Sequence, residues 1–138
     1  MPGETSLRVG VDLAAVARIE ESLAAFGERY VRRVFTAGEA AYAKAAEGRV
    51  RAERLAARFA AKEATIKALD LGERGVAWTD IEIVRMDNGA PRLALHGSAQ
   101  AAARDAHVEA FSVSLSHEDG YAIAVVVGCI EDPKRVTP

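Results

Sequence analysis

Four polar side chains stand out because of their type and their place along the chain. They are Asp12, Glu63, Lys67 and His117. Each lies at the end of an expected element or beside an apolar stripe, where a residue that is merely solvated is less expected. Carboxylates, lysine and histidine supply acid–base and metal chemistry when their surroundings shift their pKa values. These four residues are therefore the first candidates for a functional site.

Each of the four also has an ordinary structural interpretation. A carboxylate such as Asp12 after a strand often caps the following helix. Glu63 and Lys67 are four residues apart, which is the spacing of a stabilising ion pair on one helix. His117 lies in an expected hairpin turn, where a histidine is usually only a turn residue. Residue types and spacing alone leave both interpretations open.

The common short catalytic motifs are absent from the sequence. It has no P-loop, no GxGxxG after a strand, no HExxH and no nucleophile elbow. Cys129 is the single cysteine, which excludes an intramolecular disulfide and a four-cysteine zinc site. None of the enzyme classes that these motifs define is therefore indicated.

Two expected elements at the start of the chain position Asp12. Apolar residues alternate with small or polar ones over residues 7–12, which predicts a strand that ends at Asp12. Apolar residues then recur at intervals of three and four over 13–26, which predicts an amphipathic helix that Gly27 ends. Asp12 is thereby expected at a strand-to-helix junction.

Residues 51–69 form the strongest helix prediction, because their larger apolar residues make one stripe among many alanines. At about 100° per residue, Glu63 and Lys67 fall on one shoulder of this stripe. Arg58 and Lys62 fall on the other shoulder. On the pattern alone, Arg58 and Lys62 are expected to be solvated charges.

The remaining segments predict a single α+β domain. Thr36 and Glu39 have the spacing of a capping box for a helix that runs to about residue 46. The other expected elements are a hairpin of 81–86 and 92–95 around the turn 87–91, a helix at 98–106, and a hairpin of 111–116 and 121–127. This order predicts one domain over 1–138, with an antiparallel sheet, a long central helix and a polar tail at 131–138 that frays.

Composition limits the classes of partner. The 138 residues carry 18 Lys and Arg against 20 Asp and Glu, a net charge of -2, and only 6% aromatic residues. This balance predicts no general attraction to nucleic acid or to an anionic membrane. The longest apolar run, 121–129, is about half of the ~20 residues that a membrane-spanning helix needs, and the first residues lack a secretory signal pattern. We expect a cytoplasmic protein.

Several short blocks, taken in their order and spacing, resemble one known family. The blocks are Gly10-Val11-Asp12-Leu13 with Arg18-Ile19-Glu20, Val34-Phe35-Thr36 with Glu39, Arg58-Phe59-Ala60-Ala61-Lys62-Glu63-Ala64 with Lys67, Asn88-Gly89-Ala90-Pro91, and Val113-Ser114-Leu115-Ser116-His117. They are similar to those of the holo-[acyl-carrier-protein] synthases, the small single-domain class of 4′-phosphopantetheinyl transferases. The resemblance covers the chain from about residue 9 to about residue 127. It implies the fold of that class and transfer of the phosphopantetheine arm of coenzyme A to a serine of apo acyl carrier protein, with release of adenosine 3′,5′-bisphosphate.

The resemblance also implies roles for the first candidates. Asp12 and Glu63 match the family's two carboxylates that bind Mg²⁺, a cation that prefers one or two protein carboxylates together with phosphate oxygens and water. Lys67 matches the lysine that stabilises the departing phosphate. The base that takes the serine proton is either Glu63 or a metal-bound water, and the sequence leaves both open.

Coenzyme A binding is implied to involve two subunits. In the family the enzyme is a homotrimer, and coenzyme A lies between neighbouring protomers. The residues of this chain that match its nucleotide-binding groups are Arg58, Lys62, Asn88, Gly89, Pro91 and His117. Ala90 departs from the pattern, because family members usually carry Lys or Arg there, where it meets a phosphate. Arg92 is a candidate to replace that charge, whereas Glu118 adds a negative one nearby.

A local basic surface is expected to dock the acidic carrier protein. Arg18 matches the family's carrier-contacting arginine on the first helix. Arg29, Arg32 and Arg33 follow in a less regular stretch, and ordinary solvated arginines are an equal interpretation of those three.

Three alternatives remain open. The chain could be a non-catalytic trimeric module of the same fold, for which Ala90 is the supporting residue. It could be an unrelated Mg²⁺-dependent nucleotide hydrolase that uses the same two carboxylates. It could also be a transferase dedicated to a polyketide-type carrier protein rather than to the carrier of fatty acid biosynthesis.

Overall fold

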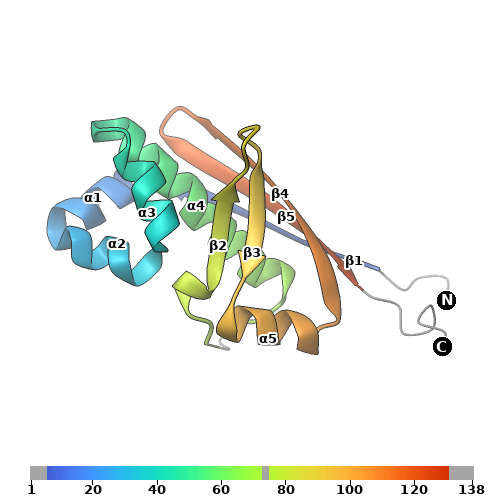
Figure 1. The fold of residues 1–138 in the computed structure, drawn as a ribbon. Helices are drawn as coiled ribbons and strands as arrows, with labels where there is room; N and C mark the ends of the chain where they lie inside the picture. Colours follow the sequence, from blue (N-terminus) through green and yellow to red (C-terminus); the bar gives the residue numbers. More distant parts are fainter. Residues whose placement is uncertain (1–5, 73–74, 131–138) are drawn as a thin grey trace, which may run out of the picture.

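The computed structural model describes residues 6–72 and 75–130 and forms an α+β domain (Figure 1). Its elements are β1 (Leu7–Ala15), α1 (Val16–Phe26), α2 (Glu28–Val34), α3 (Ala37–Lys44), α4 (Gly48–Ala68), a 3₁₀ turn (Trp78–Asp80), β2 (Ile81–Arg85), β3 (Pro91–Leu95), α5 (Gly97–Asp105), β4 (Val108–Glu118) and β5 (Tyr121–Ile130). The predicted α+β class and long central helix are confirmed. The tail expected to fray, 131–138, lies outside the described residues.

The strands form two antiparallel sheets. One has the order β1-β5-β4, and the other is the β2-β3 hairpin. Figure 1 shows α4 running between the larger sheet and the hairpin, with α1, α2 and α3 gathered at one end of the molecule. The long helix therefore contacts both sheets and provides the frame on which the other elements are arranged.

β1 packs very closely on α4 because both elements carry small residues where they meet. A Cβ added at Gly10 would lie 1.8 Å from the carbonyl oxygen of Ala64 and 2.7 Å from the backbone nitrogen of Ala68. Ala60, Ala61 and Ala64 are fully buried on the same helix. Only glycine fits at position 10, since any side chain would meet helix backbone rather than a movable group.

The first predicted strand was too short and the first predicted helix too long. β1 continues past Asp12 to Ala15, and α1 begins at Val16. The longer strand is held by the pairing with β5, which extends to Ala15 opposite Tyr121. Asp12 lies within the strand opposite Ala124, so its interpretation as a helix N-cap is wrong. The helix α2, in the stretch that looked irregular, was also not predicted.

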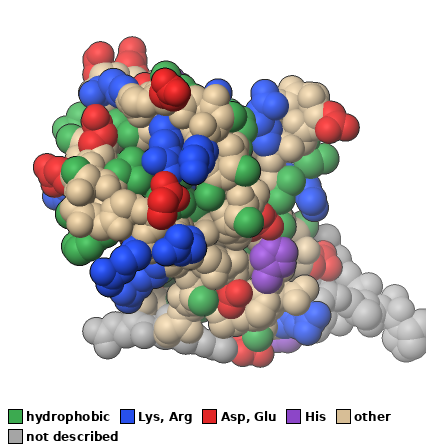
Figure 2. Space-filling view, turned by 60° about the vertical axis from the view of Figure 1, so that its left-hand side comes forward, with side chains coloured by type: hydrophobic (Ala, Val, Ile, Leu, Met, Phe, Trp, Pro, Cys, Tyr) green, Lys and Arg blue, Asp and Glu red, His purple; other side chains and the backbone are tan. Residues whose placement is uncertain are grey.

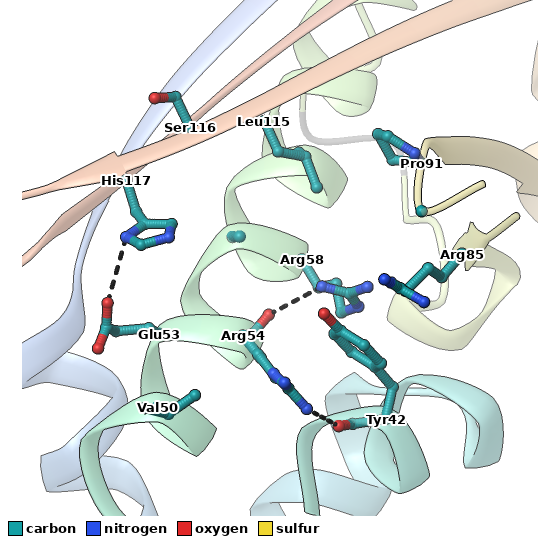
Figure 3. Close-up of a pocket in the computed structure, with 12 residues that line it drawn as sticks. Tyr42, Val50, Glu53, Arg54, Arg58, Arg85, Pro91, Leu115, Ser116 and His117 are labelled. Atoms are coloured by element: carbon teal, nitrogen blue, oxygen red, sulfur yellow. Dashed lines mark hydrogen bonds and ion pairs between the residues drawn. The ribbon is translucent and has the colours of Figure 1, made fainter. Parts of the chain in front are cut away.

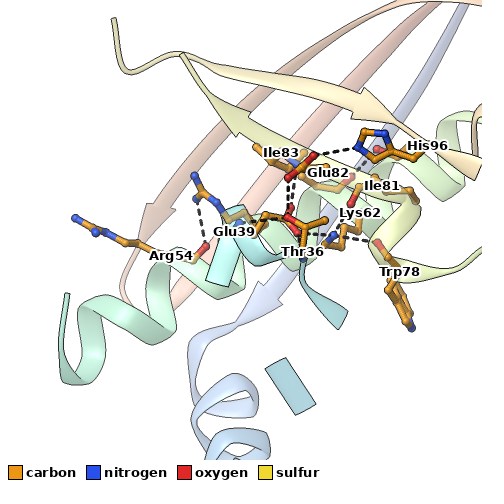
Figure 4. Close-up of polar contacts among 12 residues, drawn as sticks. Thr36, Glu39, Arg54, Lys62, Trp78, Ile81, Glu82, Ile83 and His96 are labelled. Atoms are coloured by element: carbon orange, nitrogen blue, oxygen red, sulfur yellow. Dashed lines mark hydrogen bonds and ion pairs between the residues drawn. The ribbon is translucent and has the colours of Figure 1, made fainter. Parts of the chain in front are cut away.

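A buried polar network joins α3, α4 and β2 (Figure 4). The Lys62 ammonium has no exposed side-chain surface; it lies 2.7 Å from Oε1 of Glu39 and donates to the backbone carbonyls of Trp78 and Ile81. Glu39 also completes the predicted capping box with Thr36, which is confirmed. Burial lowers the pKa of Lys62, and the charge of Glu39 opposes that effect. The expectation that Lys62 is solvated is therefore wrong.

The outer face of β1 carries an exposed apolar row. Alternate residues point away from α4, and Leu7, Val9, Val11 and Leu13 are 53%, 66%, 49% and 60% exposed. β5 adds the half-exposed Tyr121 and the exposed Ile123 beside this row. A contiguous apolar surface of this kind is typical of a protein contact. Among the described residues, no helix is both long enough and apolar enough to cross a membrane.

Candidate active site

β1 and α4 bring three of the predicted residues together. Lys67 Nζ lies 3.1 Å from Oδ1 of Asp12 and donates to the carbonyl of Val11 at 3.0 Å. Glu63 lies one helical turn before Lys67, and the charges of Asp12 and Lys67 both act on its carboxylate. The lysine thus pairs with the strand carboxylate, a contact that its four-residue spacing from Glu63 did not predict.

The charge of Asp12 opposes the ionisation of Glu63. Partial burial raises the pKa of Glu63, the charge of Asp12 raises it further, and Lys67 lowers it in part. Asp12 and Glu63 both line an open hollow of about 570 Å³, to which Arg18, Phe59 and Tyr121 also contribute. A cation bound between the carboxylates would offset their repulsion.

The donor set suits a hard divalent cation with an incomplete protein shell. Within the described ranges, no group of three or more His, Cys, Asp and Glu side chains is placed to hold a metal. Two carboxylates beside an open hollow leave positions for water and phosphate oxygens, as Mg²⁺ prefers. Asp12 and Glu63 therefore fit the predicted type of site by their chemistry.

A second hollow, of about 510 Å³, lies between α4, the β2-β3 turn and the end of β4 (Figure 3). Its residues are Tyr42, Val50, Glu53, Arg54, Ala57, Arg58, Arg85, Gly89, Pro91, Leu115, Ser116 and His117. The guanidinium of Arg58 lies 4.2 Å from the centre of the Tyr42 ring, and that of Arg54 lies 4.3 Å from it. His117 Nδ1 lies 3.2 Å from Oε2 of Glu53. The two hollows share no lining residue.

The structure brings four of the six predicted nucleotide-binding residues to this second hollow: Arg58, Gly89, Pro91 and His117. Asn88 lies in the adjoining turn, where its side-chain oxygen accepts a hydrogen bond from the Ala90 backbone at 2.9 Å. Lys62 lies one helical turn after Arg58 but does not line the hollow, because its ammonium is enclosed by Glu39 and two backbone carbonyls.

Several residues of the second hollow were not predicted, among them one tyrosine and two arginines. Tyr42, Arg54 and Arg85 all line it. Arg54 had a signal that was available, since it lies one helical turn before Arg58. Tyr42 and Arg85 had none, because α3 and β2 reach the hollow through tertiary packing. Arg58 was expected to be solvated, but it is only 5% exposed, and this expectation is wrong.

The arginines predicted to dock a carrier protein are exposed. Arg18 lies on α1 and lines the hollow that contains Asp12 and Glu63, which we call the carboxylate hollow. Arg29, Arg32 and Arg33 lie on the neighbouring helix α2. Figure 2, which brings the side with α1, α2 and α3 forward, shows Lys and Arg side chains in several groups on that face. Acidic side chains lie between them.

Paired carboxylates with a lysine, and a separate group of arginines, define a protein built to handle phosphate groups in an α+β fold. The family model of the 4′-phosphopantetheinyl transferase superfamily matches residues 8–126. The chain belongs to this family. The expected family and fold are both confirmed.

The chain is also similar in sequence to individual holo-[acyl-carrier-protein] synthases. A holo-[acyl-carrier-protein] synthase of Gloeobacter violaceus is 44% identical over 127 residues, which cover 91% of this chain and 96% of that protein. One of Anaeromyxobacter is 47% identical over 124 residues, which cover 88% of this chain and 94% of that protein.

The fold is similar to solved structures of such synthases. The coenzyme A complex of the Chronobacterium ammoniagenes synthase has a TM-score of 0.78 and 31% identity, over 93% of this chain and 100% of that one. The Helicobacter pylori synthase in complex with coenzyme A has a TM-score of 0.73 and 30% identity, over 87% of this chain and 98% of that one.

Proposed function

We propose that the chain transfers the 4′-phosphopantetheine arm of coenzyme A to a serine hydroxyl of an apo acyl carrier protein and releases adenosine 3′,5′-bisphosphate. The observation that carries the proposal is that Asp12 and Glu63 line one hollow, and that Lys67 pairs with Asp12, in a chain of this family. These residue types match the demands of an attack on a pyrophosphate, which needs charge stabilisation and positioning more than covalent chemistry.

In the reaction, a bond forms between the serine oxygen and the phosphorus that carries the pantetheine arm, and the bond to the bridging oxygen of the pyrophosphate breaks. Asp12 and Glu63 would hold Mg²⁺, and the cation would supply positive charge to the phosphate oxygens. The Lys67 ammonium stabilises the leaving phosphate. The group that accepts the serine proton is either Glu63, which lines the same hollow as Asp12, or a water bound to the cation.

The nucleotide part of coenzyme A occupies the second hollow, where Arg58, Gly89, Pro91 and His117 contact it and Asn88 shapes the adjoining turn. The mixed lining of arginines, a histidine and apolar side chains suits a ring system that carries a phosphate. Lys62 is left out of this set, because its ammonium is buried and fully partnered.

The active form is a homotrimer in which coenzyme A lies between two protomers. Two observations support this assembly. The exposed apolar row of β1 offers a contact surface, and the two hollows share no residue. A site divided between chains needs no direct connection between the two hollows of one chain.

The carrier protein docks through Arg18, Arg29 and Arg33, whose exposed positive charges suit an acidic helix. Arg18 lies beside the carboxylate hollow, so a partner that contacts it is close to the reacting groups. The reaction takes place in the cytoplasm. No observation favours a polyketide carrier over the fatty-acid carrier.

The test is intact mass spectrometry of apo acyl carrier proteins incubated with the protein, coenzyme A and Mg²⁺. A gain equal to one phosphopantetheine group is expected, and no gain with Asp12→Asn. Consumption of coenzyme A in the absence of a carrier would support the hydrolase alternative. Binding of coenzyme A without consumption would support the non-catalytic module.

A further inference from the structure

Three guanidinium groups surround one tyrosine ring in the second hollow. The ring of Tyr42 on α3 has Arg58 at 4.2 Å, Arg54 at 4.3 Å and Arg85 at 5.5 Å from its centre. Figure 3 shows Arg85 reaching in from β2 toward Arg58. The face of an aromatic ring attracts cations and fixes their positions, so this cluster holds three positive charges close together.

The positive charges have little compensation from the protein. Among the described residues, none of Arg54, Arg58 and Arg85 forms an ion pair with a carboxylate. Arg58 is 5% exposed, its Nε has no hydrogen-bond partner in the described part of the chain, and burial lowers the pKa of its guanidinium. The hollow's own carboxylate, Glu53, pairs with His117. Arg58 is buried, Arg54 is half-buried and Arg85 is exposed, and neighbouring positive charges without a carboxylate partner indicate a site for an anion.

Strand register decides which arginine of the hairpin reaches this site. Arg85 is paired with Pro91, which lines the hollow, whereas Arg92 is paired with Val84. Side chains on neighbouring positions of a strand point to opposite faces, so Arg92 faces away from the hollow. Arg85 also lies against the turn, since a Cβ added at Gly89 would be 3.2 Å from its Nη2. The expectation that Arg92 supplies the charge missing at Ala90 is therefore not supported.

We propose that Arg85, held against Tyr42 beside Arg58, binds the 3′-phosphate of coenzyme A and makes the chain prefer coenzyme A to dephospho-coenzyme A. This inference rests on the proposed function. The reacting pyrophosphate belongs beside Asp12, Glu63 and Lys67, and none of these residues lines the second hollow. The remaining phosphate is a monoester with two negative charges, and it matches a site that offers more than one guanidinium group.

The test compares binding of coenzyme A and of dephospho-coenzyme A by isothermal titration calorimetry, without carrier protein. Arg85→Ala is expected to weaken coenzyme A binding by about tenfold or more, the effect of losing one charge-assisted hydrogen bond. Binding of dephospho-coenzyme A is expected to change by less than about twofold, because the phosphate that Arg85 contacts is missing from that ligand. Arg92→Ala is the matched control, and it is expected to change neither affinity.

Several outcomes would overturn the proposal. They are an equal loss for both ligands in Arg85→Ala, no loss for either, or a wild-type protein that binds both ligands equally. Because Arg85 is exposed and lies at a strand end, the variant should keep the wild-type melting temperature, and Arg85→Lys should retain part of the preference. If the calorimetry agrees but no carrier protein gains mass, the proposed function fails and the assignment of Arg85 stands.

Discussion

Asp12 and Glu63 belong to different elements, yet their charges act on each other and on one lysine. Asp12→Asn or Glu63→Gln removes one charge from the proposed Mg²⁺ site and leaves the shape nearly unchanged. We expect either change to lower transfer by at least ~100-fold, because metal charge contributes several kcal/mol to transition-state stabilisation.

Melting temperature provides a second measurement for the two carboxylates. Mg²⁺ should raise it in the wild type and leave it unchanged in both variants, because a ligand stabilises only a fold that binds it. Glu109→Gln, an exposed carboxylate outside both hollows, is the control. Near-normal turnover of Asp12→Asn or Glu63→Gln would contradict the metal assignment.

Lys67 is expected to act mainly after the substrate has bound. Its charge is needed most when the leaving phosphate becomes more negative, so Lys67→Ala should lower kcat more than it raises KM. Steady-state kinetics with saturating carrier protein separate the two effects. A change confined to KM would mean that the lysine only holds substrate.

At the level of residues, the sequence could predict the carboxylate site but not all of the second hollow. Helical periodicity placed Glu63 and Lys67 on one face, and the resemblance placed the candidate Asp12 in the same site. Periodicity could not show that α3 and β2 cover the opposite face, which buries Lys62. Arg85 was missed for a similar reason, because its surroundings depend on how the hairpin packs against α3 and α4.

At the level of elements, the contact of β1 with α4 sets the distance between the carboxylates. Gly10→Ala is expected to destabilise the fold by roughly 3 kcal/mol, near the upper end of the usual cost of overpacking, since its Cβ would overlap helix backbone. Urea unfolding measures the loss. Gly75→Ala is the control, because a Cβ there meets no atom of the described residues within 4 Å. Equal unfolding midpoints for the two variants would contradict the close packing.

The start of α5 predicts a dependence of stability on pH. Asp80 accepts hydrogen bonds from the hydroxyl of Ser98 at 2.7 Å and from its backbone nitrogen at 2.8 Å, and these bonds lower the pKa of Asp80. A carboxylate with a lowered pKa in the folded state stabilises the fold above its unfolded pKa of about 3.9. That contribution is lost as the pH falls through the folded value.

Asp80→Ala should therefore cost roughly 1 kcal/mol at pH 7, the usual value of a helix cap. The difference from wild type should shrink below about pH 4. Urea midpoints at several pH values test this, with the exposed Asp87→Ala as the control. A difference that is constant from pH 7 to pH 3 would exclude the carboxylate as its source.

The order of the elements was predicted correctly from about residue 36 onward, where capping signals and turn residues mark the boundaries clearly. The first third of the chain was predicted less well. Asp12 resembles the end of a strand when β1 is considered alone, but pairing with β5 carries the strand on to Ala15. Long-range pairing of this kind leaves no local signal.

At the level of the whole molecule, a site divided between protomers predicts that two inactive variants can rescue each other. Glu63→Gln removes a charge from the carboxylate hollow, and Arg58→Ala removes a guanidinium group from the second hollow. Co-refolded mixtures should recover a fraction of activity set by random assortment, because some interfaces pair two intact halves. The assay needs Arg58→Ala alone to be severely impaired and subunit exchange to be confirmed. A mixture as inactive as its components would mean that one chain holds both halves.

The fit of Gly10 against Ala64 also has a consequence for how the sequence can vary. In a library of single substitutions, we expect the position that tolerates the fewest replacements to be this glycine, ahead of Asp12, Glu63 and Lys67. Replacing a charged group at the hollow leaves a folded protein that can regain function by reversion or by a nearby change. Replacing the glycine forces β1 away from α4 and destabilises the whole domain. Gly10, which has no side chain, is thus the position at which we expect the strongest constraint on residue type.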